Sequence, residues 1–292
     1  MSRHGAAWLF VTPALFVLGA FFFLPVVAAL LMSLTDFDLY ALTDIDNLRF
    51  IGLENYWRLL HEPLFWKSLG NTFYFVVLGV PLSLGASLGA AMLVNSKVAR
   101  FRNVLRTIYF APVVTTLVAV AVVWRYIFHT RYGFLNYALD FVGIGPIDWM
   151  GDPHWAMPAI VIMAVWKNFG YNMIILLAAL QSIPEDLYEA ARIDGASAWQ
   201  QFRHVTLPSL SPVLLLVSIL TMAGYFQLFA EPYVMTEGGP LESTKSVLFY
   251  MYDEGFKWWS LGRASAVAFL LFLIIFAITM LQLRLGRREA RA

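Results

Sequence analysis

The sequence of 292 residues has no cysteine and few charged residues. The absence of cysteine excludes disulfides, cysteine-based metal sites and thiol catalysis, but it identifies no compartment. Only 13% of the residues are charged, whereas 60% are hydrophobic. A soluble domain has about a quarter of its residues charged, so this composition predicts a membrane protein with several spans. The formal net charge of +1 and the scattered basic residues predict no binding of nucleic acid.

Motifs of enzyme chemistry are also missing. The histidines, which show neither HExxH nor HxH spacing, are His4, His61, His129, His154 and His204. We therefore expect no metal site. Because no GxxxxGK[ST] loop is present to hold nucleotide phosphates, the chain should bind no ATP itself. Three acids share a loop with one histidine, but prolines separate them, and we interpret them as solvated turn residues: Asp140, Asp148, Asp152 and His154.

Six apolar runs are each long enough to cross a membrane. About 20 residues of helix, rising about 1.5 Å each, span a hydrocarbon core of about 30 Å. The runs cover residues 8–34, 69–94, 104–128, 155–180, 209–230 and 261–283. The first is too long for a signal-peptide core, so we expect it to be retained. The sequence thus predicts an all-α membrane protein with six transmembrane helices and no separate soluble domain.

Loop charges orient these helices. Positive residues mark the cytoplasmic side of a membrane protein. Basic residues without an acid lie between the second and third runs, at Lys97, Arg100, Arg102 and Arg106, and the end of the chain carries Arg284, Arg287, Arg288 and Arg291. Residues 35–68 instead carry six acids against three bases. Both termini should therefore be cytoplasmic. Residues 182–208 follow the fourth of six spans and should lie on the same side, although their acids outnumber their arginines.

The second run contains a GxxxG pattern, Gly85 and Gly89, among serines and alanines. Small residues of this kind let helices approach closely. We interpret this face as a packing surface within the bundle, with a seam between two subunits as the alternative.

A polar stretch, residues 182–208, separates the fourth and fifth runs. Ser182 and Glu185 have the spacing of a capping box, with Pro184 in the first turn, and Gly195 fits a left-handed helix end. The pattern predicts a short helix that ends at this glycine.

A second short helix should follow within the same stretch. Ser197 and Gln200 repeat the capping spacing, and Pro208 should stop this helix before the fifth run. The result would be a helix–turn–helix outside the bilayer. Because Glu189 is charged and Ala190, Ala191 and Ala196 are small, the first helix could dock against a partner.

Polar side chains at bilayer depth mark two helices. Such residues usually line a pathway, because contact with lipid is costly. The fourth run places Asn168, Tyr171 and Asn172 on one face, and the fifth contributes Thr221, Tyr225 and Gln227. Rings combined with hydroxyl and amide groups suit a sugar. Simple packing remains the alternative for the tyrosines, backbone bonding for Thr221, and a bridge between helices for Gln227.

Lys167 is the least expected of these residues, because an ammonium near mid-span must pair, deprotonate or reach water. Glu231 is the candidate partner. We expect a structural or gating ion pair rather than contact with a substrate.

Several motifs resemble one family. The segment EAARIDGA, Glu189–Ala196, followed by Leu207 and Pro208, is similar to the EAA loop of permease subunits in binding-protein-dependent ABC importers. The surroundings resemble the carbohydrate branch, of the maltose and glycerol-3-phosphate type: Phe37 in LTDFD, IGLENY at Ile51–Tyr56, LQSIPEDLYEAARIDGAS at Leu180–Ser197 and MTEGGP at Met235–Pro240.

This resemblance implies a type I ABC importer permease fold. Residues 1–68 would form a flanking helix and the first extracytoplasmic loop, and residues 69–292 a five-helix core with the coupling loop 182–208. The coupling helix would enter a cleft of the ATPase through Glu189, Ala190, Ala191, Asp194, Gly195 and Ala196. The family's sugar contacts fall on Tyr171, Thr221 and Tyr225, whereas Asn168 and Leu228 depart from the maltose-type pattern.

The resemblance also implies partners. These are a second homologous permease, an ATPase dimer that holds ATP and Mg²⁺, and an extracytoplasmic sugar-binding protein, all at a bacterial inner membrane. The alternative is a stand-alone secondary solute transporter. The sequence shows neither the inverted repeat nor the paired broken helices expected of one.

Overall fold

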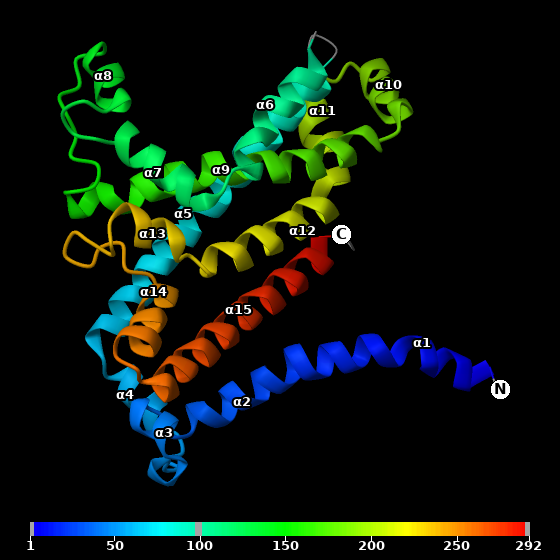
Figure 1. The fold of residues 1–292 in the computed structure, drawn as a ribbon. Helices are drawn as coiled ribbons and strands as arrows, with labels where there is room; N and C mark the ends of the chain where they lie inside the picture. Colours follow the sequence, from blue (N-terminus) through cyan, green and yellow to red (C-terminus); the bar gives the residue numbers. More distant parts are fainter. Residues whose placement is uncertain (1–2, 97–100, 290–292) are drawn as a thin grey trace. The chain divides into compact units, whose positions relative to one another are not determined.

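The computed structural model describes residues 3–96 and 101–289, and its regular elements are helices (Figure 1). Five helical segments are long and apolar enough to cross a membrane: Phe10–Ser33, Pro63–Asn95, Pro153–Gln181, Ala198–Phe226 and Leu261–Gly286. A bent pair of helices can supply a sixth span. The predicted all-α membrane fold is confirmed. Three bases that entered the orientation argument, Lys97, Arg100 and Arg291, lie outside the described residues.

The third span is broken, although the sequence predicted one continuous helix over residues 104–128. Helix α6 (Arg102–Val114) and helix α7 (Leu117–Ile127) meet at 101°. Thr115 and Thr116 between them are extended, with ψ of 142° and 138°. The break follows Pro112 and falls in a run of four β-branched residues, 113–116, which are weaker helix formers.

The chain divides into two compact units. The first contains residues 3–66 and 250–273. Its helices are α1 (Arg3–Leu18) and α2 (Leu24–Ser33), joined by a π-helical turn, then α3 (Leu39–Thr43), α4 (Glu54–Leu60) and the first part of α15 (Leu261–Glu289). The side chains described along α1 and α2 are mostly exposed, as expected of a helix that faces lipid.

Asn55 organises the corner of this first unit. Its buried amide donates hydrogen bonds to the carbonyl oxygens of Ser33 (2.9 Å) and Thr35 (2.8 Å), and the neighbouring Tyr56 hydroxyl lies 2.8 Å from Ser33 Oγ. Gly52 adopts a φ of +60°, which favours glycine. The IGLENY motif therefore ties the end of α2 to α4.

A charged cluster closes the same unit. Arg263 Nε lies 3.5 Å from Glu254 Oε2, and its Nη2 donates to the Tyr250 hydroxyl at 3.1 Å. Burial, together with the charge of Glu254, raises the pKa of Tyr250, so its phenol stays protonated. The buried carboxylate is thus compensated by a guanidinium.

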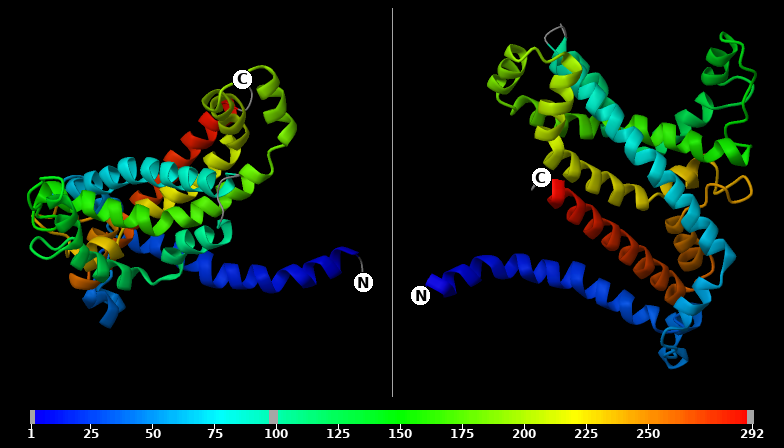
Figure 2. Two further views of the ribbon diagram at one scale, coloured as in Figure 1. Left: turned by 90° about the horizontal axis from the view of Figure 1, so that it is seen from above. Right: turned by 180° about the vertical axis from the view of Figure 1, so that it is seen from behind.

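The second unit contains residues 67–249 and 274–289. Its helices are α5 (Pro63–Asn95), α6, α7, α8 (Phe134–Asp140), α9 (Pro153–Gln181), α10 (Glu185–Ile193), α11 (Ala198–Gln201), α12 (Leu207–Phe226), α13 (Ala230–Met235), the start of α14 (Val247–Tyr252) and the end of α15. Helix α9 is central. It crosses α5 (Figure 2) and packs against α6, α7, α12 and α13.

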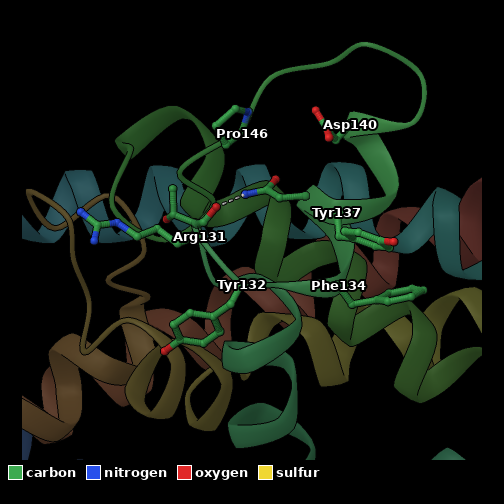
Figure 3. A pocket seen from close by; sticks show the side chains of 8 residues that line it. Arg131, Tyr132, Phe134, Tyr137, Asp140 and Pro146 are labelled. Atoms are coloured by element: carbon green, nitrogen blue, oxygen red, sulfur yellow. Dashed lines mark hydrogen bonds between the residues drawn. The ribbon is translucent and has the colours of Figure 1, made fainter.

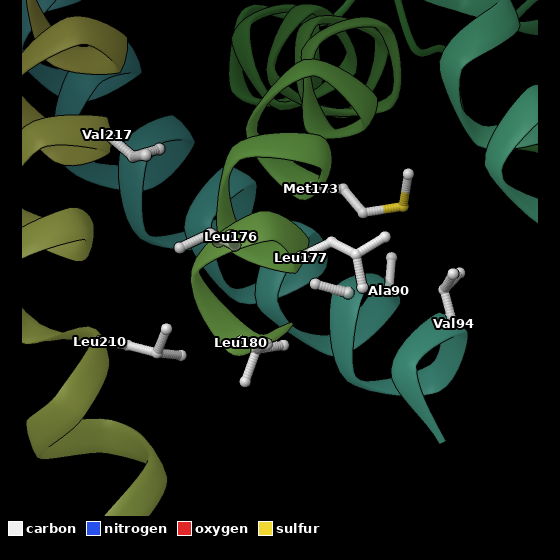
Figure 4. Close-up of a cluster of buried hydrophobic side chains, with 9 residues drawn as sticks. Ala90, Val94, Met173, Leu176, Leu177, Leu180, Leu210 and Val217 are labelled. Atoms are coloured by element: carbon white, nitrogen blue, oxygen red, sulfur yellow. The ribbon is translucent and has the colours of Figure 1, made fainter. Parts of the chain in front are cut away.

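Aliphatic side chains from three helices form the core of this unit (Figure 4). Leu176 and Leu177 of α9 lie between Ala90 of α5 and Leu210 and Val217 of α12. A hydrogen bond of 3.0 Å from Ser87 Oγ to the carbonyl oxygen of Phe169 adds a polar contact between α5 and α9. Small residues on α5 allow this close approach.

The prediction for Gly85 and Gly89 is wrong. Both glycines are exposed, and a Cβ on either would meet no atom within 4 Å. The packing face of α5 consists instead of Ser83, Ser87 and Ala90, which are buried. The predicted packing within the bundle is thus confirmed for these neighbours of the glycines and not for the glycines themselves, for which a seam between two subunits stays a prediction.

Candidate functional site

A cavity of about 540 Å³ lies between α9, α12, α13 and the break of the third span. All six predicted substrate residues line it: Asn168, Tyr171, Asn172, Thr221, Tyr225 and Gln227. Glu231 lines it as well, and Val113 and Leu117 contribute the wall at the break. The size is typical of a small-molecule site. The structure thus brings together residues that the sequence placed on two separate helices.

Helix α9 presents three polar side chains at i, i+3 and i+4 spacing. Tyr171 is half exposed, whereas Asn172 is buried. The Asn172 amide donates to the Thr221 hydroxyl at 2.9 Å and to Ser83 Oγ at 3.4 Å. Asn172 and Thr221 therefore join α9 to α12, and their remaining hydrogen-bonding capacity faces the cavity. Thr221 makes this bond to a side chain, not the expected bond to its own helix.

Tyr225 stands at the wall formed by α12. Its ring is buried, lies 4.9 Å from the Phe75 ring and fills the space beside Gly79, where a Cβ would come within 2.7 Å of Tyr225 Cε2. Its hydroxyl lies near Ser83 and Asn168 but meets no partner in hydrogen-bond geometry among the described residues. A buried polar atom without a partner is costly, so this hydroxyl would gain from any partner that a rearrangement of the cavity wall brought to it.

The fifth span ends earlier than predicted. Helix α12 stops at Phe226, and Gln227 caps it while its side-chain amide donates to the carbonyl oxygen of Ala223 at 3.0 Å. Glu231 therefore does not share a helical stripe with Gly224 and Gln227. It lies in the first turn of the separate helix α13, where a carboxylate is favourable.

The predicted ion pair between Lys167 and Glu231 does not form in this structure. Lys167 Nζ instead donates to carbonyl oxygens at the end of α6, those of Thr115 (3.0 Å), Pro112 (3.2 Å) and Val113 (3.5 Å). The sequence could not show this partner, because a continuous third helix would have no carbonyl groups free.

The polar stretch forms helix α10, which ends as predicted. Gly195 has a φ of +79°, and the amide of Ala196 donates to the carbonyl oxygen of Ala191 at 2.9 Å. The predicted cap at its start is wrong. Pro184 is the N-cap residue, whereas Ser182 belongs to the end of α9 and donates its hydroxyl to Ala179.

The second short helix predicted in residues 182–208 starts where the sequence indicated but does not end there. Ser197 and Gln200 form the predicted capping box, with bonds of 2.7 Å and 3.4 Å. Pro208 does not stop the helix. The chain runs helically from Ala198 through a π-helical turn, Phe202–Thr206, to Phe226. This irregular turn directly before Pro208 lets the helix accommodate a residue without an N–H.

Side-chain contacts fix α10 to this long helix. The Tyr188 hydroxyl lies 2.9 Å from Thr206 Oγ1, and the Gln201 amide donates to the carbonyl oxygen of Ala196 at 2.9 Å. Tyr188 is half-buried, whereas the opposite face of α10 is exposed. These contacts join α10 to the helix that continues into α12, which lines the cavity.

The exposed face of α10 carries the predicted Glu189 and Ala190 together with an apolar residue that sequence reasoning missed, Ile193. Asp186, Glu189, Ala190 and Ile193 follow i, i+3, i+4, i+7 spacing, and Ile193 is 86% exposed. Trp199 of α11 is also exposed. The sequence feature that could have identified this apolar contact is an isoleucine beside the charged residues of a short polar helix. Glu189 makes only a long contact, 3.9 Å, with Arg192.

A second cavity, of about 470 Å³, belongs to the loop between α7 and α9 (Figure 3). The Asn136 amide donates to Thr130 and Ile147 and accepts from Trp149, which holds the loop together. Figure 3 shows the rings and charges around it, those of Arg131, Tyr132, Phe134, Tyr137, Asp140 and Pro146. One loop supplies all of its walls, so it forms no passage between helices.

Two acids that the sequence assigned to turns cap this region. Asp148 accepts hydrogen bonds from Thr130 and from the amide of Gly151, and Asp152 is the N-cap residue of α9. Hydrogen bonds from the backbone and ring of His154 lower the pKa of Asp152. No group of three or more His, Cys, Asp or Glu side chains suited to a metal occurs among the described residues.

Comparison with known proteins agrees with this geometry. Residues 79–291 match the family described as binding-protein-dependent transport system inner membrane component. The chain is similar to a lactose transport system permease protein of Rhizobium radiobacter, with 37% identity over 97% of this chain and 94% of that protein. It is also 36% identical to a trehalose/maltose transport system permease protein of Thermococcus litoralis, over 96% of this chain and 93% of the relative.

Solved structures show the same fold. A chain of a bacterial ABC transporter involved in the import of the acidic polysaccharide alginate superposes with a TM-score of 0.81 over 98% of this chain and 96% of its own length, at 22% identity. With these relatives, the multi-pass fold and the central cavity, the chain belongs to the family of inner-membrane permease components of binding-protein-dependent transport systems.

Proposed function

We propose that this permease forms the path for a neutral carbohydrate and is driven by a separate ATPase. The observation that carries this proposal is the cavity between α9 and α12, which is lined by Asn168, Asn172, Thr221 and the rings of Tyr171 and Tyr225. Sugars need hydrogen-bonding groups for their hydroxyls and rings for their C–H faces, and this cavity offers both.

The charge of the cavity favours a neutral sugar over a phosphorylated or acidic one. Among its described lining residues only Glu231 carries a formal charge, and no arginine, lysine or histidine is present to pair with an anion. An anionic ligand would therefore meet a carboxylate and no cation among the lining residues. The relatives named for lactose, trehalose/maltose and arabinooligosaccharides agree with this choice.

The exposed face of α10 is proposed as the surface that docks the ATPase. Glu189 offers a charge, Ile193 an apolar anchor, and Ala190 a small neighbour between them. Buried apolar groups ringed by polar ones commonly dominate interfaces. Ala191, Asp194, Gly195 and Ala196 shape the end of the helix, and ATP and Mg²⁺ would belong to the partner. A stand-alone transporter is set aside, because the family depends on a binding protein.

The same proposal places the remaining parts. Residues 69–292 would form the permease core and residues 1–68 the flanking helix with its extracytoplasmic loop. A second homologous permease would complete the path, and both termini would be cytoplasmic. An extracytoplasmic sugar-binding protein would deliver the cargo. By alternating access, nucleotide binding would move α10 and, through Tyr188 and Thr206, the cavity wall on α12.

The test uses the complete complex with its cognate binding protein in lipid vesicles. Uptake and ATP hydrolysis are measured with a panel of neutral mono-, di- and oligosaccharides, against glycerol phosphates and uronic-acid oligomers. We expect stimulation by one neutral class. The variant Tyr171→Ala should reduce uptake, whereas Tyr74→Ala, an exposed tyrosine of α5 that does not line the cavity, should not. Stimulation by an anionic sugar alone would contradict the proposal.

A further inference from the structure

The break of the third span leaves backbone groups that need partners. Helix α6 ends at Val114 and Thr115 is extended. The Thr115 amide still donates to the carbonyl oxygen of Pro112 at 3.3 Å, but the carbonyl groups that follow lack the amides that a continuous helix would supply. Each polar group left unpaired in the hydrocarbon region costs several kcal/mol. A break at this depth persists only if something else satisfies these oxygens.

Lys167 supplies that partner from the facing helix α9. This lysine is 9% exposed as a residue, and its ammonium group reaches the carbonyl oxygens of Pro112, Val113 and Thr115 at 3.0–3.5 Å. The C-terminal end of a helix is the negative end of its dipole and attracts a cation. The lysine thus acts as a cap from another helix, and the favourable geometry requires α6 to stop where it does.

Neighbouring residues of α9 hold both halves of the broken span. A Cβ at Gly170 would lie 2.0 Å from the carbonyl oxygen of Tyr109, so glycine permits direct backbone contact with α6. Trp166 packs edge-on against Trp124 of α7, with ring centroids 5.5 Å apart. Within five residues, α9 therefore contacts α7 through Trp166, the break through Lys167 and α6 through Gly170.

The break is part of the cavity wall. Val113 and Leu117, one on each side of it, line the cavity together with Asn168, the neighbour of Lys167. Glu231 lines the same cavity from α13, which packs against both α7 and α9. The Lys167 ammonium therefore has a second candidate partner on the other side of the break. A change in the angle between α6 and α7 would withdraw the carbonyls and leave the carboxylate.

We propose that Lys167 is a positioning residue that latches the broken third span, bound to the α6 carbonyls in this conformation and transferred to Glu231 when the span changes its angle. This proposal rests on the proposed function and extends it, because it names the element with two arrangements that alternating access requires. The lysine sets the shape of the cavity and need not touch the cargo.

The experiment measures the angle directly. Because the chain contains no cysteine, spin labels can be placed at Val104→Cys on α6 and Val122→Cys on α7, both exposed, in an otherwise cysteine-free complex. The distance between the labels is measured without nucleotide and in a state trapped with ATP. Hydrolysis of ATP, with and without the binding protein, is measured on the same samples.

Three variants separate the outcomes. Lys167→Met should broaden the distance distribution without nucleotide and reduce stimulation by the binding protein about tenfold, within the usual range of coupling between sites. Lys167→Arg, which keeps the cation, should restore most of both. Glu231→Gln should leave the distance without nucleotide unchanged and abolish its shift on trapping. Lys257→Met, an exposed lysine outside the cavity, serves as the control.

A Lys167→Met complex with the normal distance distribution and normal stimulation would overturn the latch. A Glu231→Gln complex in which the label distance shifts normally on trapping would overturn the transfer of the lysine. This second variant still tests the proposal if Lys167→Met does not assemble. The distance measurement needs only the ATPase and nucleotide. A wrong choice of cargo would instead appear as a wild-type complex that no neutral sugar stimulates.

Discussion

A substitution at Gly195 can distinguish two roles of this residue, a simple helix stop and a close contact with the ATPase. The glycine ends α10 with a φ of +79°, and a Cβ at this position would meet no atom of the chain within 4 Å. Any cost of a substitution within the chain therefore comes from the backbone conformation alone. Asparagine visits the left-handed region routinely, so Gly195→Asn should cost less than the roughly 1–2 kcal/mol that an ordinary L-residue pays.

The docking hypothesis predicts a much larger effect of the same change. If the ATPase approaches the end of α10 closely, the new side chain blocks a packed contact. Disruption of such a contact costs about 2 kcal/mol or more, which is about 30-fold in affinity. We expect Gly195→Asn to insert and assemble with its permease partner normally but to lose most of the ATPase during purification and most of the uptake.

Gly143 provides the matched control. It has a φ of +77°, and its Cβ position is also open, but it belongs to the loop between α8 and α9. Gly143→Asn should carry the same backbone cost and retain the ATPase. Affinity of the ATPase for both variants is measured in detergent with labelled subunits. If Gly195→Asn binds the ATPase as Gly143→Asn does, the glycine is only a helix stop and the reasoning fails.

Three further changes test the site and the docking face. Ile193→Ser removes an exposed apolar anchor from α10 and should weaken ATPase binding by about tenfold without loss of expression, as measured by co-purification; unchanged binding would show that this side chain stays in solvent. Tyr225→Phe removes a hydroxyl without a partner, so thermal stability should change by less than about 0.5 kcal/mol, whereas the affinity for transported sugar should fall up to about tenfold; unaltered uptake kinetics would reduce Tyr225 to a packing residue. Gly79→Ala places a Cβ within 2.7 Å of the Tyr225 ring and should cost about 1–3 kcal/mol of stability while lowering uptake, in a thermal-shift assay and vesicle transport, and Gly85→Ala, whose Cβ meets nothing, should do neither.

The class of fold and most residues of the candidate site could be predicted from the order of the amino acids. Long apolar runs must be helical in a bilayer, because only a helix pairs its own backbone groups there. The same physics makes polar residues at mid-span informative, which is why Asn168, Tyr171, Thr221 and Tyr225 could be selected and are found around one cavity. The left-handed end at Gly195 and the capping box at Ser197 are local features, and both are present.

How these helices contact one another depends on packing between residues that are distant in the sequence. Composition cannot show that the third span breaks after Val114, because apolar residues continue on both sides of this point and the break is stabilised by Lys167 from another helix. Neighbours distant in sequence likewise determine which side of α5 packs. They also determine that the helix continues through Pro208 and that Glu231 lies on the separate helix α13. Local patterns fix where backbone groups lack partners, whereas the fold determines which side chain reaches them.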